Sequence, residues 1–187
     1  MIILEGHRQM AEVGFARFSA REVAKRIGYS IGTVYNVFGT HDRLILAINT
    51  RTFRLWADHL RERLAGEETD RIRVLVEGYF SFARENPNLW MAIYDHRLPP
   101  DAAMPEEFEK QRAELTEIVT AEIAAALPDR VRPSAPRLAR SMIATVHGHC
   151  TFALNGTFAL MGEHEPLALA LARVRETLAA ADHHPIG

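Results

Sequence analysis

Apolar residues recur at every third or fourth position over most of the chain, which is the pattern of α-helices that bury one face. Stripes of this kind cover residues 1–13, 41–64, 70–84, 87–94, 106–127, 138–160 and 166–181. Since no stretch alternates regularly between apolar and polar residues, no β-strand is predicted. Together with two short helices between positions 19 and 39, these segments predict an all-α protein of about nine helices.

Residues 19–44 carry the densest set of helix start and stop signals in the chain. Ser19 is followed three residues later by Glu22, the spacing of a capping box, in which each side chain accepts a hydrogen bond from the other residue's backbone N–H. Gly28 ends this helix, and Ser30 caps the next one. Two short helices joined by a glycine-containing turn form a helix-turn-helix. The side chains expected to face its core are Val23, Ala24, Ile27, Val34, Val37 and Phe38.

The second short helix leaves Thr33, Tyr35 and Asn36 on the face that its apolar residues do not use. Hydroxyl groups can donate hydrogen bonds to phosphates, and an asparagine amide matches the edge of an adenine. A helix-turn-helix also occurs in helical proteins that do not bind DNA, where such residues are ordinary surface. The pattern alone therefore leaves a DNA-binding surface and a plain surface equally open.

Residues 19–44 resemble the DNA-binding segment of the tetracycline-repressor (TetR) family of bacterial transcription regulators. The matching positions are Ala24, Gly28, Ser30, Gly32, Thr33, Val34, Tyr35, Phe38, Thr40, Asp42 and Leu44. The resemblance implies a surface for double-stranded DNA made of Ser19, Arg21, Ser30, Ile31, Gly32, Thr33, Tyr35, Asn36, Thr40 and His41. Within it, Tyr35 and Thr40 are expected to contact phosphates, and Thr33 and Asn36 to face bases or sugar edges.

Two positions depart from the family pattern. His41 stands where the family usually has a lysine that meets a phosphate, and Ile31 stands where a lysine or another polar residue is common. Both changes remove positive charge, so we expect a modest DNA affinity or an unusual operator.

The resemblance also implies a domain organisation. Residues 1–45 are predicted to form the DNA-binding domain and residues 46–187 the ligand-binding and dimerisation domain, linked by a helix over about 41–65 that Thr40 caps. In the family a polar arm precedes the first helix, whereas here the helical pattern starts at Met1, so the arm is expected to be missing or the start truncated. The last two helices are expected to form the four-helix core of a homodimer, which matches a palindromic operator.

A ligand pocket is predicted from aromatic and other apolar residues in the middle of the chain, although each of them is more often plain core. They are Tyr79, Phe82, Trp90, Met91, Tyr94, Phe108, Met142, Val146, His147 and Phe152. A Pro-rich loop between Leu98 and Pro105 is expected to gate entry. The expected function is a repressor that an apolar or aromatic effector releases from DNA. The alternative is a ligand-binding helical bundle that binds DNA weakly or not at all.

One further similarity concerns a subgroup of the family that carries a Trp…His-Gly signature in its ligand domain. His147 and Gly148 match this signature, and Ile143 stands in the place of the tryptophan. Gly148 and Gly156 fall within the predicted helix 138–160, where a glycine costs about 1 kcal/mol relative to alanine. We expect a close helix–helix approach, such as a dimer interface, to compensate for this cost.

Charge changes the picture only slightly. Residues 1–60 contain eight Lys/Arg and five Asp/Glu, which leaves +3 there and −5 in the remainder of a chain whose net charge is −2. A mildly basic N-terminal third suits a protein that offers one face to a polyanion. The single Cys150 excludes an internal disulfide. With no apolar run near the roughly 20 residues of a membrane span, we expect no membrane contact and a cytoplasmic location.

Other chemistry has little support in the sequence. No nucleophile elbow or phosphate-binding loop occurs, so we predict no enzymatic activity and no cofactor. His147 and Cys150 are neighbours on a helix, but the four ligand positions of a zinc site are missing, so we predict packing rather than a metal site.

Overall fold

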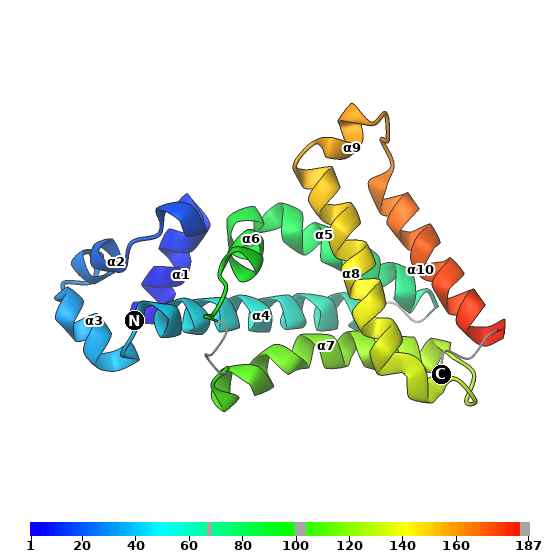
Figure 1. Cartoon of the computed structure of the whole chain (residues 1–187), viewed down its shortest axis with the longest axis horizontal. Coiled ribbons are helices and arrows are strands. Elements are labelled where there is room, and N and C mark those ends of the chain that lie inside the picture. Colours follow the sequence, from blue (N-terminus) through cyan, green and yellow to red (C-terminus); the bar gives the residue numbers. More distant parts are fainter. Residues whose placement is uncertain (67–68, 100–103, 184–187) are drawn as a thin grey trace. The chain divides into compact units, whose positions relative to one another are not determined.

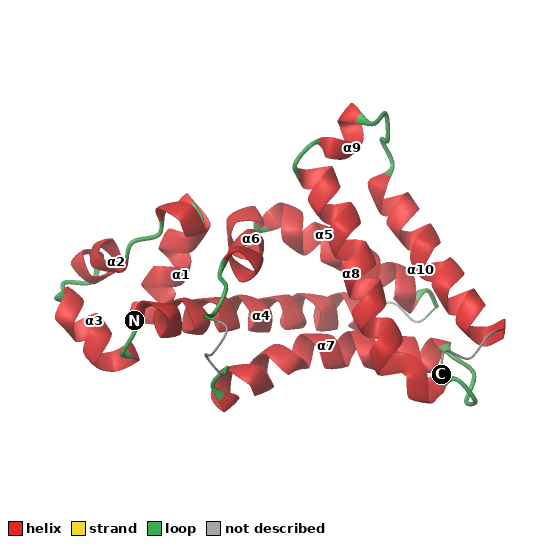
Figure 2. Ribbon diagram, viewed as in Figure 1, coloured by secondary structure: helices red, strands yellow, loops and turns green. Residues whose placement is uncertain are grey.

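The computed structural model describes residues 1–66, 69–99 and 104–183, and this described part is all-helical without a strand (Figures 1 and 2), which confirms the predicted fold class. Two 3-10 turns, Phe15–Arg17 and Arg132–Ser134, accompany the α-helices. The α-helices of the described residues are α1 (Ile2–Val13), α2 (Ala20–Arg26), α3 (Ile31–Phe38), α4 (His41–Ala65), α5 (Arg71–Glu85), α6 (Pro87–Asp95), α7 (Glu106–Ala126), α8 (Ala135–Leu154), α9 (Thr157–Leu160) and α10 (Pro166–His183).

The chain divides into two compact units. The N-terminal unit comprises residues 1–56 and 85–113, and the C-terminal unit comprises residues 57–84 and the chain from Glu114 onward. Helices α4, α5 and α7 each contribute residues to both units. The functional boundary near residue 45 stays a prediction. No helix of the described residues combines the length and the apolar character that crossing a membrane requires.

The core of the N-terminal unit forms where α1 packs on α2 and α6, and α2 packs on α3. Gly6 allows α1 to approach α4 closely, because a Cβ at this position would lie 2.6 Å from Cδ1 of Ile48. The buried side chains of this core include Ile2, Met10, Val23, Ala24, Val34, Leu44, Ile45, Ile48, Leu89 and Ala92.

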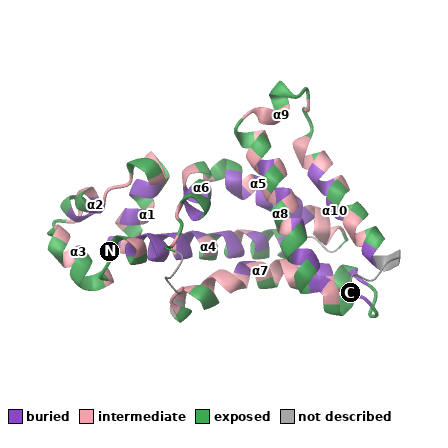
Figure 3. Ribbon diagram, viewed as in Figure 1, coloured by how far each residue is buried: buried purple, intermediate pink, exposed green. Residues whose placement is uncertain are grey.

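Helix α4 is buried at every position from Leu44 to Thr50, as its purple stretch in Figure 3 shows. Further along, Trp56 and Leu60 are buried as predicted, but Leu55, predicted for the same stripe, is 38% exposed. The buried positions follow a four-residue spacing, and each such step turns the buried side by about 40° around the axis. By the second half of α4 the inner face has therefore rotated away from Leu55.

The C-terminal unit contains the packed pair α8 and α10 together with parts of α4, α5 and α7. The single helix predicted over residues 138–160 is wrong, because α8 ends at Leu154 and a short α9 starts at Thr157. Between them Gly156 adopts a left-handed φ of 78°, and Asn155 Oδ1 accepts a hydrogen bond from Thr157 N at 3.0 Å. These two residues form a turn that stops one helix and caps the next.

This break also changes the reading of the two glycines. Gly156 belongs to the turn, where its positive φ is the reason for a glycine. Gly148 lies inside α8 and is exposed, and apart from its chain neighbours and the backbone of its own helix, no atom of the described residues would lie within 4 Å of a Cβ added there. The close approach that we expected at Gly148 is therefore not made within the chain.

Candidate functional site

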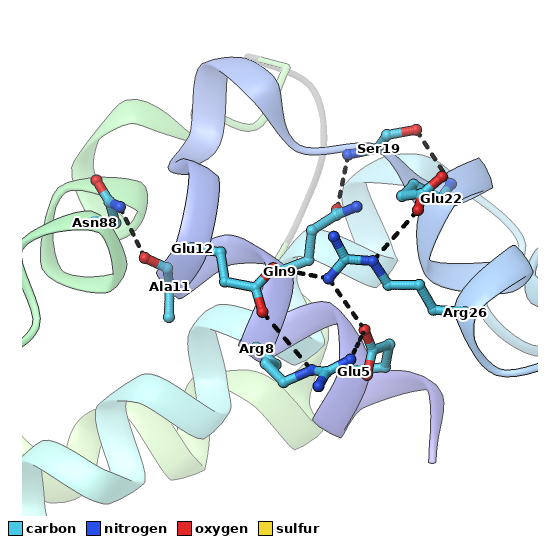
Figure 4. Close-up of polar contacts among 9 residues, drawn as sticks. All are labelled: Glu5, Arg8, Gln9, Ala11, Glu12, Ser19, Glu22, Arg26 and Asn88. Carbon is cyan, nitrogen blue, oxygen red and sulfur yellow. Dashed lines mark hydrogen bonds and ion pairs between the residues drawn. The ribbon is translucent and has the colours of Figure 1, made fainter.

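The start of α2 is held by one predicted and one unpredicted hydrogen bond. Ser19 Oγ accepts from Glu22 N at 3.3 Å, which is the predicted N-cap. The reciprocal half of the capping box is wrong, because Ser19 N donates to Gln9 Oε1 at 2.9 Å and Glu22 instead pairs with Arg26 (Figure 4). Gln9 is a buried residue of α1, so a bond between helices replaces the local one.

An ionic cluster links α1 to α2 on the surface of the N-terminal unit (Figure 4). Arg26 Nη1 lies 2.8 Å from Glu12 Oε2 and 3.4 Å from Glu5 Oε1, and Arg8 Nη2 lies 2.8 Å from the same Glu5 oxygen. The hydrogen bond from Arg8 lowers the pKa of Glu5, and the hydrogen bond to Glu12 raises the pKa of Arg26. Ion pairs near the surface add little stability each, and here they join side chains of α1 to Arg26 of α2.

The turn and the second helix begin as predicted. Ser30 Oγ accepts from Thr33 N at 3.1 Å and lies 2.9 Å from Thr33 Oγ1. Thr40 Oγ1 accepts from Arg43 N at 3.2 Å at the start of α4. Gly28 has a φ of 74°, the left-handed conformation that lets the chain reverse between α2 and α3. The N-caps at Ser30 and Thr40 are therefore confirmed.

Helix α3 presents a mixed polar and apolar outer face. Val34 is fully buried, and Ile31 and Phe38 pack against the same core. These three inner residues lie within about 60° of one another around the helix axis, whereas Val37 lies roughly 90° from their middle. Val37 is 62% exposed, so the prediction that it faces the core is wrong. Tyr35 is also exposed, and it lies on the other side of the buried stripe, because residues two apart on a helix point in nearly opposite directions.

The residues proposed for DNA contact all belong to the N-terminal unit. Ser19, Thr33 and Ile31 are half-buried, and Ile31 points its apolar side chain at the core instead of outward. The ring of His41 lies 5.9 Å from that of Phe18 in a tilted arrangement. The exposed members of the predicted set are Arg21, Ser30, Gly32, Tyr35, Asn36, Thr40 and His41.

Three hydrogen bonds that the sequence did not predict brace α6 against the elements carrying the helix-turn-helix. Asn88 Nδ2 donates to Ala11 O at 2.7 Å, and Asn49 Nδ2 donates to Ala92 O at 3.0 Å. His96 Nε2 lies 3.0 Å from Asp42 Oδ1, at the start of α4. These partners are 43 to 77 residues apart in the chain, so no local pattern announces them.

The C-terminal unit holds an apolar cavity of about 40 Å³ between α5, α7, α8 and α10. Its one hydroxyl group belongs to Tyr79, whose oxygen lies 3.0 Å from Nδ1 of His147. Burial lowers the pKa of His147, so its ring is neutral at pH 7. The cavity is lined by Ile72, Leu75, Val76, Tyr79, Val119, Ile123, Met142, Ile143, Val146 and Val174.

Three of the predicted pocket residues, Tyr79, Met142 and Val146, line this cavity, and His147 contacts it through Tyr79. The structure does not bring the others together there. Phe82 is buried against the ring of His59, and Phe152 is 43% exposed. The members of the predicted set that belong to the N-terminal unit are Trp90, Met91, Tyr94 and Phe108. Sequence reasoning missed the aliphatic lining, since Ile, Leu and Val give no signal that separates a cavity wall from ordinary core.

Two further predictions concern this region. The gating loop includes Pro100 and Asp101, which lie outside the described residues.

Burial raises the pKa of the Cys150 thiol to about 12, so the thiol stays protonated and unreactive at neutral pH. Within residues 1–66, 69–99 and 104–183, no group of three or more His, Cys, Asp or Glu side chains could hold a metal ion.

Comparison with known proteins covers both units. Residues 2–48 match the model of bacterial regulatory proteins of the tetR family, and residues 72–174 match that of the tetracyclin repressor-like C-terminal domain. No curated protein matches the chain in sequence.

Solved structures share the fold over nearly the whole length of each chain. A protein of unknown function from Rhodococcus sp. RHA1 is 20% identical to this chain, with a TM-score of 0.73. The match covers 96% of this chain and 92% of the Rhodococcus protein. The multidrug binding protein EbrR, in complex with imidazole, is 21% identical with a TM-score of 0.64 and coverages of 95% and 92%. A TetR transcription regulator from Haloarcula marismortui ATCC 43049 is 21% identical with a TM-score of 0.61 and coverages of 96% and 95%. At these identities the likeness establishes the fold alone.

Proposed function

The chain belongs to the TetR family and is a ligand-responsive, DNA-binding transcription regulator, and from this premise we propose that it is a repressor released from a palindromic operator by a small apolar or aromatic molecule. The observation that carries the DNA-binding part is the capped helix pair, whose second helix turns Tyr35 and Asn36 outward from a packed core. A regulator of chromosomal DNA works in the cytoplasm. We assign DNA binding to residues 1–45 and ligand binding and dimerisation to the remainder.

On the DNA, α3 enters the major groove. Tyr35 and Thr40 hold phosphates through their hydroxyl groups, and Asn36 reads an adenine edge. Thr33 faces a base or sugar edge, although its hydroxyl is shared with Ser30 in the free protein. His41 offers no fixed positive charge where the family usually has lysine, so phosphate contact at the start of α4 is weaker than is usual in the family.

The repressor acts as a homodimer formed by α8 and α10 of two copies. Support comes from large apolar side chains that one chain leaves in solvent next to these helices, since exposed groups of this kind mark interfaces. Phe152 is 43% exposed, Leu160 91% and Met161 68%. A two-fold axis between the copies would set two recognition helices on the half-sites of a palindrome.

The effector binds at the cavity in the C-terminal unit. Its lining is apolar except for Tyr79, which with His147 can fix the orientation of one polar group on the effector. Pockets for small molecules usually measure about 300–1,000 Å³, so binding must enlarge a cavity of about 40 Å³. That enlargement moves α5, α7 or α8, and α4 carries the change because it is one continuous helix with residues in both units. The subgroup with the Trp…His-Gly signature stays a prediction.

A competition gel shift tests the DNA-binding part. A labelled duplex from the region upstream of the protein's own gene should bind at a fixed salt concentration and resist a hundredfold excess of unrelated duplex. Equal competition by both duplexes, or no binding at all, would favour the alternative of a ligand-binding helical bundle that has lost specific DNA contact.

A further inference from the structure

A second hollow, of about 400 Å³, lies in the N-terminal unit beside α1, α4 and the start of α7. It has ten times the volume of the cavity in the C-terminal unit. Its lining combines apolar side chains from α1 and α7 with two arginines, Arg51 and Arg54, three residues apart on α4. Residues that far apart on a helix share one side, so both guanidinium groups can serve the same bound molecule.

The arginines of this hollow lack counter-charges. Within the described residues, neither Arg51 nor Arg54 has a carboxylate at ion-pair distance, although most other arginines of α1, α2 and α4 do. The charge of Arg51 acts on His7, whose pKa falls to about 4 because of burial and of that charge. His7 is therefore neutral at pH 7, and among the side chains that line the hollow only Arg51 and Arg54 carry a positive charge.

Arg51 is half-buried, Arg54 is exposed, and both line the hollow. Since no carboxylate of the described residues neutralises them, an anion with several acceptor oxygens can bind both guanidinium groups.

The apolar side of the hollow limits which anion fits. Ile3, Leu4 and Phe108 line it, and Leu4 is 55% exposed, which is unfavourable for a leucine with no cover. A free inorganic ion would leave this surface in water. An anion that carries a hydrocarbon part would cover it.

We propose that this hollow is a binding site for an amphipathic carboxylate, distinct from the effector cavity of the C-terminal unit. Arg51 and Arg54 bind the carboxylate, and Ile3, Leu4 and Phe108 pack against its hydrocarbon chain. An arginine matches a carboxylate in two parallel hydrogen bonds, which favours this head group over an uncharged one.

Calorimetric titration of the full chain with octanoate, in the absence of DNA, tests this site. Octanoate should bind with one site per chain, and 1-octanol, which has the same hydrocarbon chain without the charge, should bind at least tenfold more weakly. Arg51→Met and Arg54→Met keep an unbranched apolar side chain and should each weaken octanoate binding at least tenfold. Arg51→Lys keeps the charge and should weaken it less than Arg51→Met.

A control variant tests whether any lost arginine on α4 has the same effect. Arg43→Met removes an exposed arginine from the same helix and should bind octanoate like the unchanged protein. Octanoate binding that persists in either Arg51→Met or Arg54→Met, that is lost in Arg43→Met, or that 1-octanol equals would overturn the proposal. Since no DNA is present, a failure of operator binding leaves this test unaffected.

Discussion

At the scale of single residues, Tyr35 and Asn36 stand side by side on α3, both exposed, and carry different proposed roles. Asn36→Ala should lose about 1–3 kcal/mol of binding free energy at the cognate operator and relax the preference for one base there. Tyr35→Phe removes a phosphate contact and should weaken binding to all duplexes by a similar factor. Fluorescence anisotropy against the cognate duplex and single-base variants measures both. A change of preferred sequence in Tyr35→Phe, with Asn36→Ala unchanged, would contradict these roles.

Two half-buried histidines make stability depend on pH. The pKa of His7 falls to about 4 and that of His147 is also lowered, mainly through burial. In the unfolded chain both titrate near pH 6.5, so between pH 6.5 and 5 the unfolded state binds more protons and the free energy of unfolding decreases as the pH falls. Glu5, whose pKa is lowered, loses its contribution only below its ordinary value of 4.5.

Urea unfolding at pH 7 and at pH 5 measures this effect. His7→Gln should reduce the difference in unfolding free energy between the two pH values, and an exposed histidine, His164→Gln, is the matched control that should not. An unchanged difference in His7→Gln would contradict the burial argument.

Residue-scale predictions from sequence held where the partner is local. Ser30 and Thr40 cap their helices because the acceptor oxygen and the N–H lie three residues apart, a distance that the sequence specifies. The predicted hydrogen bond from Ser19 N to the Glu22 side chain does not form, because Ser19 N donates to Gln9 Oε1, ten residues earlier in the chain. Which of two acceptors wins depends on how α1 lies on α2, and that is a property of the packed unit.

At the scale of helices, Gly148 tests the proposed dimer. In a single chain a side chain at this position meets open space, so Gly148→Leu should leave each chain folded. If α8 packs against a second copy, the added side chain should clash there and raise the dissociation constant of the dimer at least tenfold. Sedimentation over a range of concentrations measures this constant. Ala16→Leu, at an exposed position of the N-terminal unit, is the control that should leave it unchanged.

If the dissociation constant of Gly148→Leu equals that of the unchanged protein, the part of α8 around Gly148 does not lie in the dimer interface. A mass of 21.1 kDa for the unchanged protein would contradict the homodimer.

Whole helices followed from the hydrophobic pattern, but their breaks and faces followed less well. The stripe over α8 continues past Leu154, so only the φ of Gly156 reveals the turn that ends the helix. Val37 lies at the edge of the apolar face of α3, where period alone cannot decide between core and solvent. The prediction of the pocket residues was the least accurate. The aromatic residues that suggested a pocket belong to two different units, and mostly aliphatic residues line the cavity.

At the scale of the whole molecule, regulation requires that effector and operator oppose each other. The effector needs only to bind the DNA-free conformer more tightly, and a coupling of about 1–3 kcal/mol is typical. Operator DNA should therefore weaken effector binding by the same factor by which the effector weakens DNA binding. Titrating each in the presence and absence of the other, at one salt concentration, measures both factors. An effector that fills the cavity and leaves operator affinity unchanged would contradict the proposed regulation, although the cavity would still be a binding site.

The most direct measurement of the central claim is a hydroxyl-radical footprint of the upstream region with the full chain bound. A dimer with one recognition helix per copy should protect two short stretches related by two-fold symmetry, with centres about one helical turn of DNA, roughly 10 base pairs, or a multiple of it apart. Asn36→Ala should weaken both stretches equally. A single protected stretch, or even protection along the whole duplex, would contradict a dimeric repressor that reads a palindromic operator through α3.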